Sequence, residues 1–172
     1  MSLKEYQEKR DFGETSEPMP RESGGSGPLI YVMQKHHASH LHYDLRLEVD
    51  GILKSWAVPK GPSMNPHDKR LAVLVEDHPL DYARFEGEIP AGQYGAGRVD
   101  VWDSGSWIPL EEYRDIKKAL EEGAMEFLLE GKKLKGEFRL VAMKHSTAKH
   151  GWLLIKAQDE YASDDFYDAN ER

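Results

Sequence analysis

Side chains able to bind a metal ion or a phosphate are concentrated in one short stretch, residues 34–49. Four histidines, one aspartate and one arginine fall within the eleven residues from His36 to Arg46. His42 and Asp44 have the two-residue spacing of metal ligands on a strand, and His36 lies six residues upstream, close enough for the chain to fold back and supply a third ligand. The planar guanidinium of Arg46 suits two phosphate oxygens. The residue types therefore predict a divalent metal ion beside a phosphate.

The segment that carries these side chains alternates strictly. Between residues 41 and 49 every odd position is apolar and every even position is charged or a histidine. This period of two predicts a half-buried β-strand, whose polar face presents its side chains about 6 to 7 Å apart. Asp50-Gly51 then predicts a hairpin turn into a second strand at 52–58.

A second group of titratable side chains follows the apolar run 71–75, which predicts a strand buried on both faces. Glu76, His78 and Tyr82 belong to this group. Sites are commonly built at the end of a buried strand, and Pro79 holds the backbone of His78 extended. A capped surface turn is the alternative interpretation of this stretch. The glycine-rich segment 86–97 is interpreted as a structural loop, because no helix pattern follows it to bind a phosphate.

The remaining pattern predicts a mainly β protein: a small closed or partly closed antiparallel barrel of about eight strands, with a sandwich as the alternative. One main helix is expected near 111–122, ended by Gly123, with minor helical turns elsewhere. Ser104-Gly105 predicts a turn. The expected strands are 29–33, 41–49, 52–58, 71–75, 98–102, 124–129, 134–143 and 152–157.

Charge and composition divide the chain of 172 residues into three parts. Residues 1–28 are polar and end in a Gly/Ser/Pro run, which predicts a flexible N-terminal arm that contributes to the site. Residues 29–158 form the predicted domain, and residues 159–172 an acidic C-terminal tail. The net charge of −8 comes from the two ends, since residues 29–158 hold 18 basic and 19 acidic residues. A local basic groove is compatible with this balance, whereas a continuous duplex-binding face is not expected. The basic residues of the local groove would be Arg46, Lys54, Lys60, Lys69 and Arg70.

Neither a signal peptide nor an apolar run of membrane-spanning length is visible, so a cytoplasmic location without membrane contact is expected. Cysteine is absent from the sequence, which excludes thiolate ligands and disulfides.

A series of short motifs runs in order along nearly the whole chain. They are Arg10-Asp11-Phe12 with Thr15 and Glu17-Pro18; Gln34-Lys35-His36 with Ala38-Ser39; Leu41-His42-Tyr43-Asp44 with Arg46-Leu47-Glu48; Leu53 through Ser63; Glu76-Asp77-His78-Pro79 with Tyr82; Phe85-Glu86-Gly87 with Ile89-Pro90; Tyr94-Gly95-Ala96-Gly97; Leu134-Lys135-Gly136; and Trp152 through Lys156. Together these motifs resemble those of the 3′-phosphoesterase domain of bacterial DNA ligase D and of its stand-alone relatives.

This resemblance implies an enzyme of DNA double-strand break repair by non-homologous end joining. It would act as a phosphodiesterase that removes a 3′-terminal ribonucleoside and then as a phosphomonoesterase that removes the 3′-phosphate. The product is the 3′-OH that a ligase needs. The expected partners are a DNA primer-template with a 3′ ribonucleotide or a 3′-phosphate, and a separate DNA ligase with other end-joining proteins.

The resemblance also implies the site residues. The metal, manganese or else cobalt or zinc, would be held by His36, His42 and Asp44. The scissile phosphate would be engaged by Arg46, His78 and Tyr82, and the diesterase step would further need Arg10, Asp11, Glu17 and Glu76. Independently of the resemblance, the basic groove predicts that Lys60 and Arg70 also contact the substrate. We expect His78 to protonate the leaving oxygen, because an unperturbed imidazole titrates near neutral pH.

Two other interpretations use the same residues. His42 and Asp44, with His78 or His145, could form the facial triad of an Fe(II) oxygenase, Arg46 then holding a 2-oxo acid. The protein could also be a non-catalytic docking module of a DNA repair complex with a structural metal. Structural metals usually have four protein ligands, whereas three good ligands cluster here.

Overall fold

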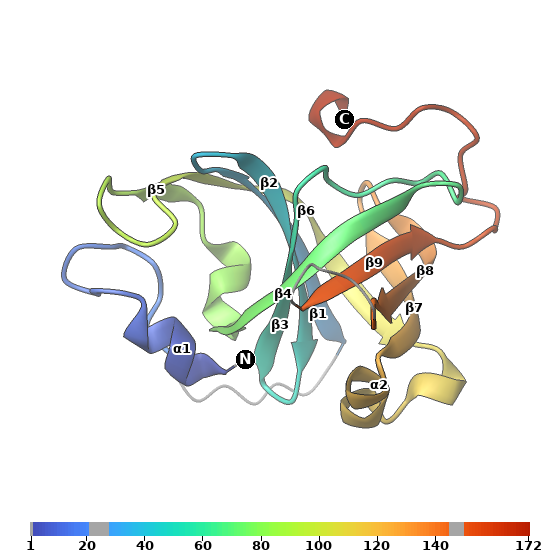
Figure 1. The fold of residues 1–172 in the computed structure, drawn as a ribbon, viewed down its shortest axis with the longest axis horizontal. Coiled ribbons are helices and arrows are strands. Elements are labelled where there is room, and N and C mark those ends of the chain that lie inside the picture. The colour runs from blue at the N-terminus through green and yellow to red at the C-terminus, as the bar shows by residue number, and fades with distance from the viewer. Residues whose placement is uncertain (1, 21–27, 145–149) are drawn as a thin grey trace.

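The computed structural model describes residues 2–20, 28–144 and 150–172, and the described strands close into an eight-stranded antiparallel barrel (Figure 1). The strand order is β1-β2-β3-β4-β9-β8-β7-β6, and β6 pairs back onto β1. This confirms the closed antiparallel barrel predicted from the sequence. The barrel strands are β1 (Leu29–His37), β2 (Leu41–Val49), β3 (Ile52–Val58), β4 (Lys69–Pro79), β6 (Gly97–Pro109), β7 (Ala124–Gly131), β8 (Lys135–Ala142) and β9 (Gly151–Lys156).

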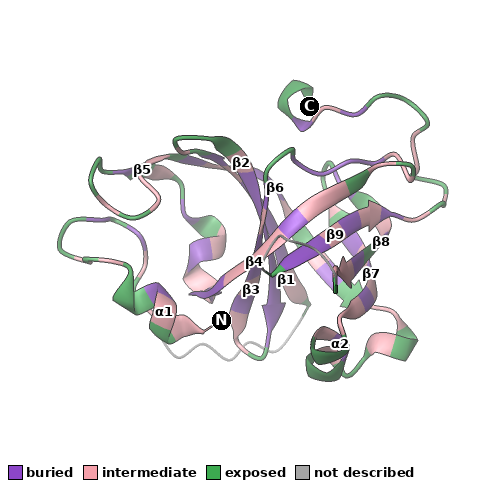
Figure 2. Ribbon diagram, in the orientation of Figure 1, coloured by how far each residue is buried: buried purple, intermediate pink, exposed green. Residues whose placement is uncertain are grey.

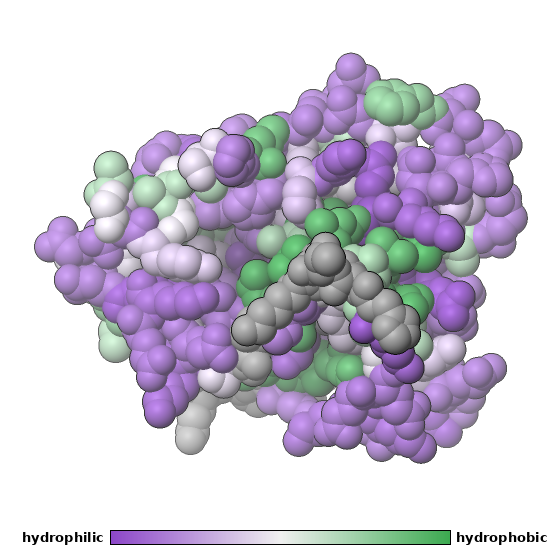
Figure 3. All heavy atoms as spheres, in the orientation of Figure 1, coloured by the Kyte–Doolittle hydropathy of each residue, from purple (hydrophilic) through white to green (hydrophobic). Residues whose placement is uncertain are grey.

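The other described elements are short and lie outside the barrel wall. The three-residue strand β5 (Gly87–Ile89) pairs with β6. Among the described residues the helices are too short and too polar to cross a membrane, and the face drawn in Figure 3 is largely hydrophilic. The helices are α1 (Leu3–Glu8), α2 (Ile116–Glu122) and the single turns η1 (Leu80–Arg84), η2 (Glu111–Tyr113) and η3 (Ala169–Glu171).

The barrel interior is filled by apolar side chains of the alternating strands, and Figure 2 shows buried residues along these strands. Tyr43, Leu45 and Leu47 of β2 point inward and are buried with Trp56 and Phe127 in one large cluster. Burial of each such side chain stabilises the fold by roughly 1.5–3 kcal/mol. Because successive side chains of a strand point to opposite faces, the other side chains of β2 point out of the barrel.

The outward face of β2 is also buried, contrary to the half-buried strand predicted from its alternation. Asp44, Arg46 and Glu48 are 6%, 3% and 7% exposed. The N-terminal arm and η1 cover this face, and a second, smaller apolar cluster forms outside the barrel around Tyr6 and Tyr82. The strand alternates because its two faces contact different surroundings, a barrel core on one side and a covered polar site on the other.

A β-bulge in β4 orients the second group of site residues. Leu53 pairs with His78 but Ser55 pairs with Val75, so β4 has one more residue than β3 at this point. Bulges turn side chains and increase local twist. The preceding run 71–75 is only partly buried, and complete burial begins at Glu76, inside the strand rather than after it. The predicted two-sided burial of 71–75 was therefore wrong, because only Ala72 of this run is buried in the barrel core and its neighbours are partly exposed.

Two other local predictions were wrong in detail. The helix expected over 111–122 is divided into η2 and α2, because Asp115 caps a new helix by accepting a hydrogen bond from the Lys118 N–H at 3.2 Å. Gly123 ends α2 with φ 81°, as predicted. The expected turn at Ser104-Gly105 lies inside β6; a Cβ at Gly105 would come within 2.0 Å of the Glu130 carbonyl oxygen, so glycine permits close contact with β7.

The C-terminal tail packs against the barrel. Tyr167 and Ala169 belong to the interior cluster, and the Trp102 indole donates to the Ala169 carbonyl at 3.1 Å. Arg70 Nη2 donates to the Tyr167 carbonyl at 3.0 Å. The tail therefore completes the core of the barrel, whereas the predicted domain boundaries remain a prediction.

Candidate active site

Three potential metal ligands converge on the outer face of the β1–β2 hairpin. His36 lies directly opposite His42 across the hairpin, and Asp44 follows on the same face of β2. One ligand atom from each of the three lies within 4.8 Å of the other two. Asp44 Oδ2 is 3.3 Å from His42 Nε2 and 3.7 Å from His36 Nδ1. The hairpin thus brings together the three ligands predicted from the sequence.

Backbone carbonyls determine which ring nitrogen each histidine turns to the cluster. His36 Nε2 lies 2.6 Å from the Gly95 carbonyl oxygen, and His42 Nδ1 lies 3.0 Å from the His40 carbonyl oxygen. A carbonyl only accepts, so these nitrogens carry the hydrogen. His36 Nδ1 and His42 Nε2 are the nitrogens that face Asp44, where each can donate a proton to the carboxylate or, in the neutral ring, offer its lone pair to a metal ion. Such outer hydrogen bonds are typical of metal-binding histidines, and the donor set fits a divalent ion.

Electrostatics favour an ionised Asp44. Burial alone would raise the pKa of its carboxyl, but hydrogen bonds from His36 and His42 and the charge of Arg46 hold that pKa well below its usual range. For His42, burial would lower the pKa, and the hydrogen bond and charge of Asp44 raise it instead. A cation is therefore the stable partner of Asp44, whether it is a proton on His42 or a metal ion.

Arg46 is held beside this cluster with part of its guanidinium free. Its Nε donates to Gln34 Oε1 at 2.6 Å, and the guanidinium lies 4.7 Å from the centre of the Tyr82 ring. Gln34 is fixed in turn by donating to the carbonyls of Tyr82 and Phe85 at 2.7 and 3.1 Å. Arg46 Nη1 is buried and, among the described residues, has no hydrogen-bond partner. A buried unpaired cationic donor is costly unless an anion binds it.

His78 lies deep in the site in its neutral form. Its Nδ1 donates to the Glu76 carbonyl at 2.9 Å, and its Nε2 is 3.3 Å from Arg10 Nη2. Burial, followed by the charges of Arg46 and Arg10, lowers the pKa of His78 well below its usual value. The ordinary pKa assumed from the sequence was therefore wrong, because two guanidinium groups that are distant in the sequence flank the ring.

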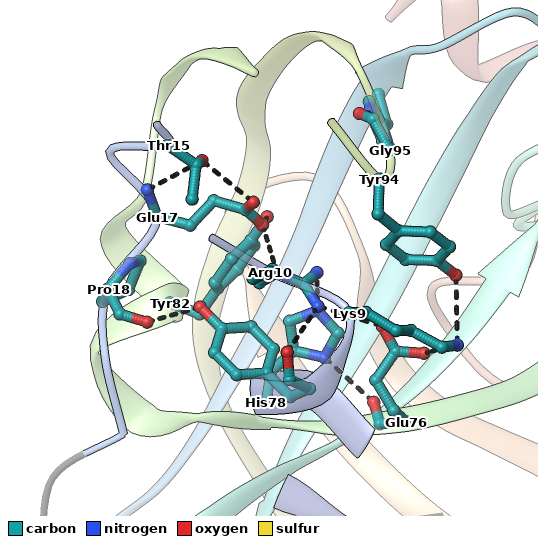
Figure 4. A network of polar contacts seen from close by, with 12 residues as sticks. Lys9, Arg10, Thr15, Glu17, Pro18, Glu76, His78, Tyr82, Tyr94 and Gly95 are labelled. Atoms are coloured by element: carbon teal, nitrogen blue, oxygen red, sulfur yellow. Dashed lines mark hydrogen bonds and ion pairs between the residues drawn. The ribbon is translucent and has the colours of Figure 1, made fainter. Parts of the chain in front are cut away.

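The N-terminal arm supplies a buried polar network (Figure 4). Arg10 Nε donates to Glu17 at 2.8 Å and Nη1 donates to Glu76 at 3.3 Å, while its side chain is 5% exposed. The Tyr82 hydroxyl donates to Glu17 at 2.5 Å. Burial, with Glu17 adding to its effect, raises the pKa of Tyr82 well above its usual value, so the phenol stays protonated. The arm is thereby joined to β4 and η1 at the site.

Together these groups line a cavity of about 280 Å³. Its wall contains the three potential ligands, the guanidinium groups of two arginines, and the side chains of the β4 group. The cavity is therefore lined by potential metal ligands together with cationic and hydrogen-bonding groups. The cavity is lined by Arg10, His36, His42, Asp44, Arg46, Glu76, His78, Tyr82, Tyr94 and Gly95, together with small and aliphatic residues.

Three predicted site residues lie elsewhere. Asp11 is exposed and accepts the Gly13 N–H in a turn of the arm. Arg70 donates to the carbonyls of Lys60 and Tyr167 at 2.9 and 3.0 Å near the C-terminal tail. Arg70 and His78 are eight residues apart on β4, roughly 26 Å at strand rise, so the structure does not bring Lys60 and Arg70 to the cavity.

The oxygenase interpretation loses one of the two histidines that were considered as its third ligand. The ligand group found in the described part of the chain contains His36 and not His78. His145, the other histidine considered, lies outside the described residues.

Several site residues were not predicted from their own chemistry. Gln34 orients Arg46, Lys9 donates to Glu76 at 3.1 Å, and Tyr94 lines the cavity. The sequence held one indication of the role of Gln34: it follows the apolar run 29–33 and lies two residues before His36, so the two side chains share a face of the strand. In the structure Gln34 is buried.

Comparison with known proteins identifies a family for this chain. A model of the DNA ligase D 3′-phosphoesterase domain family matches residues 34–142. The chain is 55% identical over 159 residues to the multifunctional non-homologous end joining protein LigD of Pseudomonas aeruginosa. The aligned region covers 91% of this chain and 19% of that protein. The chain is 41% identical over 164 residues to LigD of Mycolicibacterium smegmatis, covering 92% and 21%. The chain thus spans about a fifth of the length of the curated relatives it matches.

Proposed function

Since the chain belongs to the DNA ligase D 3′-phosphoesterase domain family, we propose that it is a metal-dependent hydrolase that prepares broken DNA 3′ ends for ligation. It removes a 3′-terminal ribonucleoside as a phosphodiesterase and then the 3′-phosphate as a phosphomonoesterase. The substrate is a DNA primer-template ending in a 3′ ribonucleotide or a 3′-phosphate, and a separate DNA ligase with end-joining proteins completes the repair. The cytoplasmic location predicted from the sequence belongs to this proposal.

The observation that carries the proposal is the unpaired nitrogen of Arg46. Arg46 Nη1 is buried without a partner among the described residues, while its neighbour Nη2 is 3.7 Å from Asp44 Oδ2. A phosphate bound here receives hydrogen bonds from the guanidinium and lies next to the three potential metal ligands. The pairing of a guanidinium fork with a divalent metal position is suited to phosphoryl transfer.

His36 Nδ1, His42 Nε2 and the Asp44 carboxylate would hold the metal ion, for which we propose Mn²⁺, with Co²⁺ or Zn²⁺ as alternatives. Three protein ligands leave positions open, as in catalytic rather than structural sites. When bound, such an ion polarises a phosphoryl oxygen and lowers the pKa of a coordinated water.

The remaining side chains bind the substrate and move protons. Arg46, positioned by Gln34, binds the phosphate, and the protonated phenol of Tyr82 is a second donor. A phosphate between Arg46 and Arg10 offsets their two positive charges, which raises the pKa of His78 from its depressed value. His78 can then carry a proton at Nε2 and donate it to the leaving oxygen.

The two steps differ in which bond breaks. In the first, the oxygen of water bonds to phosphorus and loses a proton to solvent, the bond to the 5′ oxygen of the terminal ribonucleoside breaks, and His78 gives that oxygen its proton. In the second, the oxygen of water bonds to the phosphorus of the 3′-phosphate and loses a proton to solvent, and the bond to the 3′ oxygen of the primer breaks. His78, protonated again from solvent, gives this oxygen its proton, which leaves a 3′-OH and inorganic phosphate.

The residues near the arm serve the first step in this proposal. Arg10, Glu17 and Glu76 form the network beside His78, and Asp11 supports the turn of the arm. Lys60 and Arg70, which lie away from the cavity, are proposed to contact the DNA farther from its 3′ end.

A labelled primer-template with one 3′ ribonucleotide tests this proposal. With Mn²⁺ we expect primer ending in 3′-phosphate to form first and primer ending in 3′-OH to follow, with both products reduced at least a hundredfold in His42→Ala. His37→Ala, which alters the exposed neighbour of His36, is the matched control and should retain wild-type activity. Unchanged DNA, in protein that binds the metal, would favour the docking-module interpretation instead.

A further inference from the structure

Tyr94 is an exposed aromatic residue at the mouth of the cavity. It belongs to the loop between β5 and β6, lines the cavity, and is 47% exposed. In Figure 4 its ring extends from this loop toward Lys9 and Glu76, opposite the group formed by Arg10, His78 and Tyr82. Of the two tyrosines among the described lining residues, Tyr82 is buried, so Tyr94 alone offers an open ring.

The ring is held in place from two sides. The carbonyl of the next residue, Gly95, accepts the hydrogen bond from His36 Nε2, and this backbone position has φ +74°, which glycine adopts without strain. On the other side, Lys9 Nζ is 3.4 Å from the Tyr94 hydroxyl, and Arg10 Cζ is 5.5 Å from the ring centre. A surface aromatic fixed at both ends loses little further freedom when a ligand binds it.

The exposure of two lining residues indicates what the ring contacts. Arg46 is 3% exposed and Tyr94 is 47% exposed, and both line the same cavity. For a phosphate bound to Arg46, the nucleoside attached to it therefore extends toward the open side of the cavity, where the Tyr94 ring lies.

We propose that Tyr94 forms a nucleobase subsite, in which its ring stacks on the base of the 3′-terminal nucleoside. This inference rests on the proposed function, because it takes the phosphate of a DNA 3′ end as the occupant of the cavity. The terminal base has a stacking neighbour on one side only, so it leaves the duplex more readily than an interior base. Stacking on an aromatic ring is tolerant of sequence because every base has a π-face, so the subsite accepts all four bases.

Three primer ends separate this role from the chemistry of the site: a 3′ ribonucleotide, the same ribose without its base, and a bare 3′-phosphate. For Tyr94→Ala we expect KM for the ribonucleotide end to rise about tenfold, with the abasic and 3′-phosphate ends processed as by wild type. Tyr94→Phe keeps the ring and should match wild type. Tyr161→Ala, which removes a tyrosine of the same 47% exposure away from the cavity, is the control.

The other outcomes overturn the inference. Equal impairment of Tyr94→Ala on the abasic end would mean that Tyr94 positions Lys9 or the loop, and equal impairment of Tyr94→Phe would assign the effect to the hydroxyl. An unchanged KM in Tyr94→Ala would exclude stacking. Failure of the wild-type protein on all three ends would refute the proposed function itself.

Discussion

Backbone carbonyls orient both histidines of the candidate metal site. The sequence predicted His36, His42 and Asp44 as ligands, because alternation and hairpin pairing depend on local spacing. It could not predict the Gly95 carbonyl, which is 59 residues from His36 in the chain and fixes its tautomer. Gln34 illustrates the same limit, because its role depends on Arg46 and on the carbonyls of Tyr82 and Phe85, which are distant in the sequence.

His78 gives the protein a specific dependence on pH. The pKa of His78 is lowered in the folded state, so the unfolded chain takes up a proton at this residue as the pH falls through about 6.5, while the folded protein does not. The stabilisation is complete above this pH and is lost below it. From about pH 7.5 to about pH 5.5 we expect wild type to lose about 1 kcal/mol more unfolding free energy than His78→Asn.

Urea denaturation at both pH values, with a chelator present to remove metal ions, measures this difference. The comparison with His78→Asn cancels the contributions of the other titratable groups. Parallel pH dependence in the two proteins would contradict a depressed pKa for His78.

At the scale of elements, the N-terminal arm is joined to the barrel by buried ion pairs. Arg10 contacts Glu17 within the arm and Glu76 on β4, and Tyr82 of η1 donates to Glu17. Removal of one partner from a buried pair costs up to about 3–5 kcal/mol. Without Glu17, Arg10 keeps only Glu76 as a counter-charge, and the buried Tyr82 hydroxyl loses its acceptor. For Glu17→Ala we therefore expect faster proteolysis within residues 2–20, while the barrel remains resistant.

Glu8→Ala is the matched control for this experiment. Glu8 lies in the same arm, but its ion pair with Lys4 is exposed. Exposed ion pairs contribute about 1 kcal/mol or less to the free energy of unfolding. Equal protease sensitivity of the two variants would show that the arm does not depend on the buried network.

The elements predicted best are those whose pattern is local. The β2–β3 hairpin follows from alternation and from Asp50-Gly51, whereas β1 extends four residues beyond the predicted strand 29–33. Burial of the second face of β2 could not be predicted, because the covering residues lie in an arm that is separate in sequence. The bulge in β4 was also missed, since it appears only in the register with β3.

At the scale of the whole molecule, the acidic C-terminal tail is part of the barrel core. Tyr167 is 5% exposed, whereas its neighbour Phe166 is 81% exposed. Tyr167→Ala should lower the free energy of unfolding by about 3 kcal/mol, as for other buried aromatic residues. Phe166→Ala should change it by less than about 0.5 kcal/mol. Urea denaturation of the pair measures the difference, and equal stability would mean that the tail is not bound in solution.

The barrel itself was predictable from eight short strands with turn signals between them, because antiparallel sheets of this size commonly close. The contribution of the tail to the core was not predictable from the sequence, because the composition of the tail is equally compatible with docking through Tyr167 and with a solvated chain.

The most direct test of the central claim is a nicked duplex with a 3′-phosphate at the nick, treated with the protein and Mn²⁺ and then given a separate DNA ligase. A ligase cannot seal this nick, so we expect ligated product only after treatment with wild-type protein, and none after treatment with His42→Ala or without metal. Ligation that is absent with wild-type protein, or equal with His42→Ala, would contradict the assignment of this site as a metal-dependent 3′-phosphoesterase.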